Sequence, residues 1–245
     1  KVAPLDVQAF EPAFSTPAEV LDYTPDVQKL LLEAFLVALV AGIRPLPLLA
    51  SLGDKGGGKT TLIRAISQAI LQMQPTTLSQ DPRDIMASAV RRPVLALDNV
   101  DANPPAWFPD FLAALVTGVN YERRKLYTDL DIETTKTHAV LVLSSRTAAF
   151  ARPDVAERTL PIFTGVFKYV QRESDKRLTE EVQENRNAIL SWLVHKAVTL
   201  IGRLPEAPKL PGRFVDFASV VWAFDKVGAR DALAALQKAK SLAVG

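Results

Sequence analysis

Residues 53–60 match the pattern Gly-x-x-x-x-Gly-Lys-Ser/Thr at every fixed position. In such a loop the glycines allow backbone N–H groups to turn toward a phosphate, and the helix that follows points its positive end at the same anion. Lys59 is expected to reach the β- and γ-phosphates of a nucleotide, and the Thr60 hydroxyl to bind Mg²⁺. The alternative is a glycine-rich turn that binds nothing. The candidate nucleotide contacts are Gly53, Asp54, Lys55, Gly56, Gly57, Gly58, Lys59, Thr60 and Thr61.

The flanking residues predict the two elements that hold this loop. Residues 46–52 are typical of a short buried strand, and residues 60–72 carry Leu62, Ile63 and Ile66 at helical spacing. A strand, a loop and a helix in this order are the context that the motif requires. The sequence therefore predicts a site for ATP and Mg²⁺ where the strand meets the helix.

A second candidate feature is the apolar run at residues 94–97, which ends in Asp98. An uninterrupted apolar run of this kind predicts a central parallel strand that delivers a carboxylate to the carboxyl edge of a sheet. Because it lies about 40 residues after the loop, Asp98 is expected to hold Mg²⁺ through water, opposite Thr60. The alternative is a strand followed by an ordinary turn residue.

Another apolar run, residues 139–143, predicts a second buried strand that ends in Ser144 and Ser145. A small hydroxyl at the carboxyl end of a parallel strand can contact the γ-phosphate or the attacking water, so Ser144 is a candidate catalytic residue. Serine is also common where a chain leaves a strand, and that interpretation stays open.

Residues 121–138 mix cations with β-forming side chains. Polar turn residues at 128–131 separate two such stretches, which predicts a β-hairpin. The alternative to a DNA-binding role is a solvated hairpin with no partner. The candidate DNA contacts are Arg123, Arg124, Lys125 and Lys136.

The composition favours a globular α/β chain. With 245 residues, 48% of them hydrophobic, the chain can bury one α/β domain and a smaller appendage. It has no cysteine, so it has neither disulfides nor thiolate metal sites. A net charge of +2 does not by itself indicate a nucleic-acid binder, so DNA contacts must come from local clusters.

The most apolar segment, residues 30–43, has about 14 residues, whereas roughly 20 are needed to cross a bilayer, so no membrane association is expected.

Three segments are expected along the chain. Residues 1–28 are rich in proline and predict an extended arm, residues 29–165 an α/β ATPase core, and residues 166–245 a helical subdomain. Because the sequence begins at Lys1 and not at Met, we expect a fragment of a longer protein.

Asp26 is the expected cap of the first helix. Helices are predicted at residues 26–41, 81–89, 104–116, 151–158, 179–200, 213–224 and 229–242, and a last strand at 159–163.

Together these motifs resemble the P-loop ATPases of the AAA+ type, and more narrowly the helicase-like ATPases of phages and mobile elements that are often found beside a primase. The resemblance runs from about Lys29 to Phe224, and minichromosome-maintenance helicases are similar at a greater distance. It implies a three-layer α/β fold with a parallel sheet and a C-terminal helical lid. Besides the two nucleotide motifs it includes residues 97–100, 117–118, 124–129, 152–154 with Arg158, and Arg213 with 216–218.

The resemblance implies roles for three further residues and for the hairpin. Ser144 lies where such ATPases keep a polar sensor of the γ-phosphate, which is usually Asn. Arg158 lies where AAA+ rings supply an arginine finger to the ATP of the neighbouring subunit, and Arg213 resembles the second sensor. The hairpin matches the pore hairpin of replicative helicases in position. An alternative for Arg158 is a local ion pair with Asp154 or Glu157.

The sequence departs from the AAA+ pattern at Asn99, where these proteins usually carry a catalytic Glu. An amide can orient a water molecule but cannot take its proton, so hydrolysis is expected to be slow unless another base acts. Asp101 is the nearest substitute. The mobile-element proteins that the chain most resembles share Asn at this position.

We therefore expect an ATP-hydrolysing motor that forms a hexameric ring and moves on single-stranded or forked DNA during replication of a phage or mobile element. A primase or another replication protein is the expected partner, and the cytoplasm of a bacterial or phage-infected cell is the expected location. Two other classes of function remain open. One is a nucleotide-gated switch or loader that hydrolyses ATP poorly because of Asn99, and the other is a defence or regulatory ATPase that does not move on DNA.

Overall fold

The structure, a computed structural model, describes residues 7–100, 104–124, 132–137, 139–148, 152–167 and 174–244. Its centre is a five-stranded sheet in the order β2-β3-β6-β1-β7, in which all neighbouring strands are parallel. The strands are β1 (Leu48–Gly53), β2 (Thr76–Thr77), β3 (Val94–Asp98), β6 (Val140–Ser145) and β7 (Thr159–Thr164). Only β2 was not predicted, because two threonines carry no apolar pattern.

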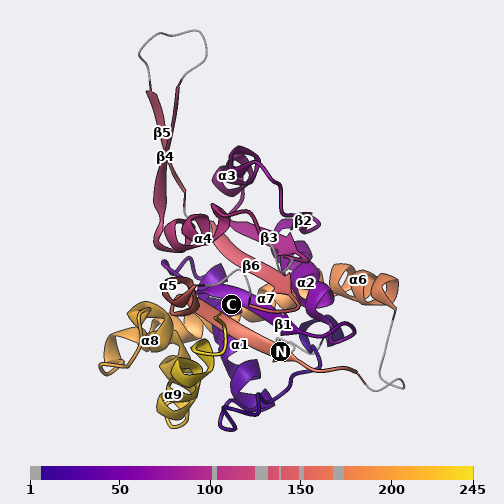
Figure 1. Ribbon diagram of the computed structural model, residues 1–245. Helices are drawn as coiled ribbons and strands as arrows, with labels where there is room; N and C mark the ends of the chain where they lie inside the picture. The colour runs from indigo at the N-terminus through magenta and orange to yellow at the C-terminus, as the bar shows by residue number, and fades with distance from the viewer. Residues whose placement is uncertain are drawn as a thin grey trace.

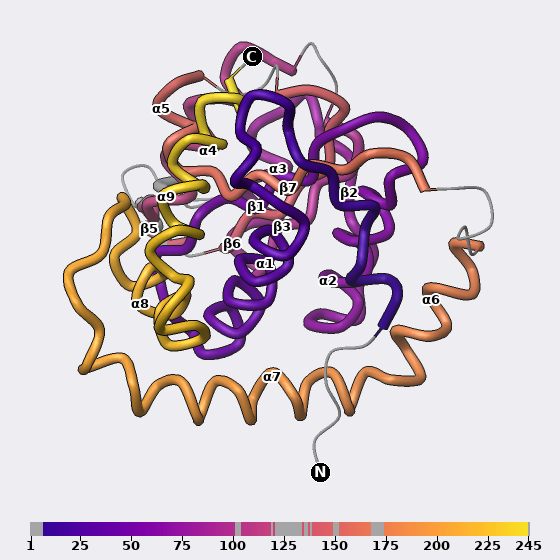
Figure 2. Tube along the Cα trace, turned by 90° about the horizontal axis from the view of Figure 1, so that it is seen from below, coloured from indigo at the N-terminus to yellow at the C-terminus, as the bar shows by residue number. Residues whose placement is uncertain are grey.

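Helices cover both faces of this sheet, so the fold is α/β with three layers, as expected. Figure 2 shows α1 (Pro25–Val40) and α2 (Lys59–Leu71) on one face, with α4 (Phe108–Thr117) and α5 (Pro153–Ala156) on the other. Strands buried on both faces need apolar side chains on both, which is why β3 and β6 contain continuous apolar runs and β1 is apolar except at Ser51. Among the residues described, no helix has the length and apolar content required to span a membrane.

Several helices begin at residues other than the predicted ones, among them α1 and α4. α1 is capped by Thr24, whose Oγ1 accepts the N–H of Val27 at 3.4 Å, and not by the expected Asp26, which lies in the first turn. α4 begins at Phe108, four residues later than predicted. Pro105 disfavours a helical backbone at Pro104, the first residue of the predicted range.

After β7, the described residues form helices only, as predicted. They are α6 (Asp175–Glu184), α7 (Arg186–Ile201), α8 (Val215–Phe224) and α9 (Ala229–Lys240), with a short 3₁₀ turn at Leu204–Glu206. The prediction of one helix over 179–200 is wrong, because Asn185 donates a side-chain N–H to the Glu181 carbonyl at 2.9 Å and ends α6 there. α7 and α8 pack on α1, and α9 packs on β7. These helices share one hydrophobic core with the sheet, and the subdomain boundary near Gly165 stays a prediction.

A separate two-stranded sheet is formed by β4 (Val119–Arg124) and β5 (Ile132–Thr137), which pair in antiparallel orientation. This is the predicted hairpin, and Figure 1 shows that it projects from the body of the molecule. At its base the Thr137 hydroxyl donates to the Ala89 carbonyl at 3.1 Å, which ties β5 to α3 (Pro82–Arg91). The predicted turn at residues 128–131 lies outside the described residues.

The described part of the N-terminal arm runs beside β7 and the glycine-rich loop. It begins with a 3₁₀ turn at Gln8–Phe10, and Phe14 forms an antiparallel bridge with Thr164 of β7. The N–H of Ala13 donates to the carbonyl of Gly57 at 3.0 Å. The arm therefore contacts the loop directly, although nothing in the proline-rich sequence indicated where it would lie.

Candidate functional site

The glycine-rich loop joins β1 to α2 at the carboxyl edge of the sheet, as predicted. Gly58 is the cap residue of α2 with a φ of 83°, a left-handed conformation that glycine adopts readily, and no side chain caps the helix. A Cβ at Gly57 would lie 2.3 Å from the carbonyl oxygen of Gly165, so a larger residue does not fit there. The first-turn N–H groups of α2 are left without a side-chain acceptor, and such groups favour a bound anion.

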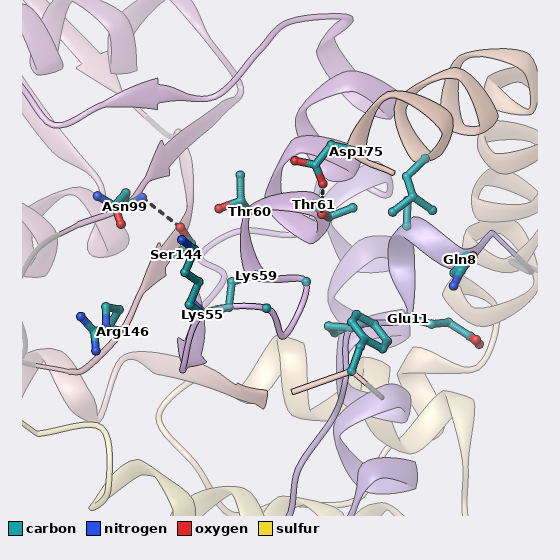
Figure 3. Close-up of a pocket in the computed structure, with 16 residues that line it drawn as sticks. Gln8, Glu11, Lys55, Lys59, Thr60, Thr61, Asn99, Ser144, Arg146 and Asp175 are labelled. Atoms are coloured by element: carbon teal, nitrogen blue, oxygen red, sulfur yellow. Dashed lines mark hydrogen bonds between the residues drawn. The ribbon is translucent and has the colours of Figure 1, made fainter. Parts of the chain in front are cut away.

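A pocket of about 510 Å³ opens over this loop (Figure 3). Its walls come from the N-terminal arm, the loop with the start of α2, the ends of β3 and β6, the chain after β7, and the start of α6. Six of the predicted nucleotide contacts line it: Lys55, Gly56, Gly58, Lys59, Thr60 and Thr61. Sequence reasoning missed Gln8, Glu11, Pro12, Arg146, Phe167 and Leu178, which come from distant segments and belong to no motif.

Asp98 lies beside Thr60, as predicted. The Thr60 hydroxyl donates to Asp98 Oδ1 at 2.9 Å, and the Ser144 hydroxyl donates to the same oxygen at 2.6 Å. The parallel register of β3 and β6 pairs Leu97 with Leu143, which brings Asp98 and Ser144 to neighbouring strand ends. Three elements thus meet at one carboxylate at the edge of the pocket.

Asn99 adopts a left-handed backbone with a φ of 54°. Its N–H donates to Ser144 Oγ at 2.9 Å, and the N–H of Val100 donates to the Ser144 carbonyl at 2.8 Å. Asn is one of the few side chains that tolerate this backbone. The Ser144 hydroxyl, which we expected to contact a phosphate, gives its one proton to Asp98 and accepts from Asn99. Asp101, the expected substitute base, lies outside the described residues.

Lys59 folds back over the loop, where its Nζ donates to the Asp54 carbonyl at 2.6 Å. Burial lowers the pKa of Lys59, and the charge of Asp54 opposes that shift. The charge of Arg146 lowers the same pKa further, whereas Asp98 raises it. The charge of Arg146 therefore acts on Lys59, and both side chains line the pocket.

Arg158 lies away from this pocket. It directly precedes β7, which runs parallel to β1, so it stands at the amino edge of the sheet while the loop stands at the carboxyl edge. The six residues of β7 separate the two edges by roughly 20 Å. Arg158 Nη1 donates to the Asp154 carbonyl at 2.5 Å and lies 3.7 Å from the Asp154 carboxylate, so the local pair left open by the sequence is present. Its buried Nε has no hydrogen-bond partner among the described residues.

Arg213 stands near Arg158 and not in the pocket. Its Nη1 lies 3.8 Å from the Glu157 carboxylate, at the end of α5. The other predicted cations are in the hairpin: Arg123 and Arg124 belong to β4 and Lys136 to β5, and Lys125 lies outside the described residues.

A model of the family described as actinomycete integrative conjugative element replication protein matches residues 19–242. Among solved structures, the A-form apo structure of the NrS-1 C-terminal region has a TM-score of 0.50 and 15% sequence identity, covering 89% of this chain and 51% of that one. Another apo structure of that region has the same TM-score and identity, covering 96% of this chain and 54% of that one. The chain thus spans about half the length of these structures, and a likeness at this identity shows the fold alone. No curated protein matches the chain in sequence.

Proposed function

Because the chain belongs to the family of actinomycete integrative conjugative element replication proteins, it is a replication protein of a mobile element, and we propose that it is an ATP-hydrolysing motor of the AAA+ type. In this proposal the pocket binds ATP with Mg²⁺. Copies of the chain form a hexameric ring that moves on single-stranded or forked DNA, which the hairpin contacts. A primase or another replication protein is the partner.

The observation that carries the proposal is that an uncapped helix N-terminus, Lys59 and Thr60 meet in one pocket, with Asp98 hydrogen-bonded to Thr60 at its edge. N–H groups and cations at one place suit a polyphosphate. A volume of about 510 Å³ lies within the usual range for small-molecule pockets, roughly 300–1,000 Å³. Apolar surfaces of Pro12, Phe167 and Leu178 line the pocket as well, and such surfaces suit a nucleobase.

Thr60 and Asp98 are the residues that would hold Mg²⁺. In the described part of the chain no three His, Cys, Asp or Glu side chains gather as metal ligands. Mg²⁺ fits such a site, because it takes one or two protein oxygens and completes its shell with phosphate and water. When bound, it offsets the negative charge that develops on the phosphates. Lys59 and the loop N–H groups bind and orient the phosphates, and Asn99 orients water.

Replacing Lys59 by Ala tests the nucleotide site. The variant should lose ATP binding, measured by calorimetry, because the cation that meets the phosphates is gone, while its circular dichroism stays that of the parent. Lys209→Ala is the control, since Lys209 is exposed and does not line the pocket. A Lys59→Ala protein that binds ATP as tightly as the parent would refute the assignment.

A nucleotide-gated switch is the second candidate function, and the observation that favours it is Asn99. Asn cannot take a proton from water, so a chain that binds ATP and assembles without fast turnover is consistent with the same pocket. The rate of ATP hydrolysis with and without single-stranded DNA separates the two functions. Strong stimulation supports the motor, whereas tight ATP binding with almost no turnover supports the switch.

A further inference from the structure

Arg146 follows the last residue of β6 at the carboxyl edge of the sheet. It lines the pocket together with Lys59 and Asn99, although no motif includes it. Figure 3 shows Arg146 on the same side of the pocket as Asn99, with Gln8 and Glu11 on the other side. Its position is therefore at the end of the pocket where β3 and β6 stop, away from the arm.

Arg146 differs from the other arginines discussed above. Arg158 and Arg213 each lie beside a carboxylate. The exposed side chain of Arg146 makes no hydrogen bond or ion pair with any residue in the described ranges. Its charge instead acts on Lys59, another cation, and is one of the causes that lower the pKa of that lysine. Two like charges that face one pocket favour an anion between them.

The Ser144 hydroxyl is not available to donate a hydrogen bond to a phosphate at this end of the pocket. Its proton goes to Asp98 and its oxygen accepts from Asn99, so it has no proton to donate to a phosphate. Arg146, two residues further along the chain, carries a planar fork of N–H donors that matches the oxygens of a phosphate.

We propose that Arg146 binds the terminal phosphate of the nucleoside triphosphate in its own protomer, and so distinguishes the triphosphate from the diphosphate. The inference rests on the proposed nucleotide site. The loop holds the phosphates and Lys59 reaches the β- and γ-phosphates, while the third phosphate extends toward the ends of β3 and β6, where Arg146 meets it from the other side. A diphosphate leaves Arg146 without a contact, so the residue contributes nothing to its affinity.

Calorimetry with Mg²⁺ and either ADP or a non-hydrolysable ATP analogue tests this proposal. Arg146→Ala should weaken binding of the analogue about tenfold or more, the usual loss for a charge-assisted pair, and change ADP binding less than about twofold. Arg146→Lys should fall between the parent and the Ala variant, because it keeps the charge without the fork. Arg230→Ala, an exposed arginine on α9, should change neither affinity.

Three outcomes would overturn the proposal. Equal losses for both nucleotides would place Arg146 on a phosphate that they share. Unchanged nucleotide affinities with a reduced DNA-stimulated rate would place it on DNA or on a neighbouring subunit. A parent protein that binds neither nucleotide would overturn the proposed function itself, and this inference with it, whereas the first two outcomes leave the proposed function standing.

Discussion

Asp98 Oδ1 accepts hydrogen bonds from two hydroxyls that come from different elements, Thr60 in α2 and Ser144 in β6. A hydroxyl that donates its proton still has lone pairs to offer. In the proposed site, Thr60 would bind Mg²⁺ through its oxygen while its hydroxyl proton stays hydrogen-bonded to Asp98, so the two side chains would not need to separate. Ser144 is hydrogen-bonded to both Asp98 and Asn99, so in the proposed site it would be a positioning residue.

The left-handed backbone at Asn99 predicts that the Glu usual in AAA+ proteins does not suit this site. Asn99→Glu should lower the free energy of unfolding by roughly 1 kcal/mol and should not speed ATP hydrolysis, because Glu tolerates a φ of 54° less well than Asn. Asn99→Asp is the matched control, since it supplies a carboxylate and tolerates that backbone. Urea unfolding and steady-state ATPase rates measure both effects. A stable, faster Asn99→Glu enzyme would mean that only a base was missing.

Single helices tie distant parts of the molecule together. α9 packs on β7, and Lys240 in its last turn is 6% exposed and donates its Nζ to the Glu157 carbonyl at 2.9 Å. That carbonyl belongs to the residue just before Arg158, so the C-terminal helix holds the corner between α5 and β7. The charges that face Lys240 are those of Glu157 and Arg213.

Lys240 should give the stability of the protein a pH dependence in the alkaline range. Burial lowers the pKa of Lys240 to about 8, so between that pH and the ordinary 10.5 the unfolded chain binds more protons than the folded one. The stability of the parent should therefore rise relative to Lys240→Met across this window, by on the order of 3 kcal/mol at most. Urea unfolding near neutral pH and near pH 10 measures the difference. Lys209→Met, at an exposed lysine, should show no such change.

Across the whole molecule, the features predictable from sequence are those carried by local patterns. β1, β3 and the loop between β1 and α2 were predicted because burial on both faces and the phosphate motif each leave a continuous signature. The contact of Ala13 with Gly57 was not, because it joins segments that share no pattern. Arg146 was missed for a related reason: its significance depends on where the Ser144 proton goes, and no spacing encodes that.

The arrangement of the molecule also decides what Arg158 can do. It stands at the amino edge of the sheet, roughly 20 Å from the loop of its own chain, so it cannot reach a phosphate bound by that loop. Arg213 lies at the same edge, beside Glu157. In the ring that the resemblance to AAA+ proteins implies, this edge of one subunit would meet the pocket of the next. Either Arg158 acts on a neighbour or its pair with Asp154 is its whole role.

Mixing two inactive variants separates these roles. Arg158→Ala should lower the ATPase rate by about 10³ or more if the residue acts as an arginine finger. Lys59→Ala should be inactive as well, but it keeps an intact Arg158. Combined, the two should partly recover activity, because a Lys59→Ala subunit can offer its Arg158 to the intact pocket of an Arg158→Ala neighbour. A mixture of Arg158→Ala with the Lys59→Ala, Arg158→Ala double variant supplies no Arg158 and should stay inactive. If Arg158→Ala alone retains full activity, Arg158 serves only its pair with Asp154, and the proposed ring loses its main support from the sequence.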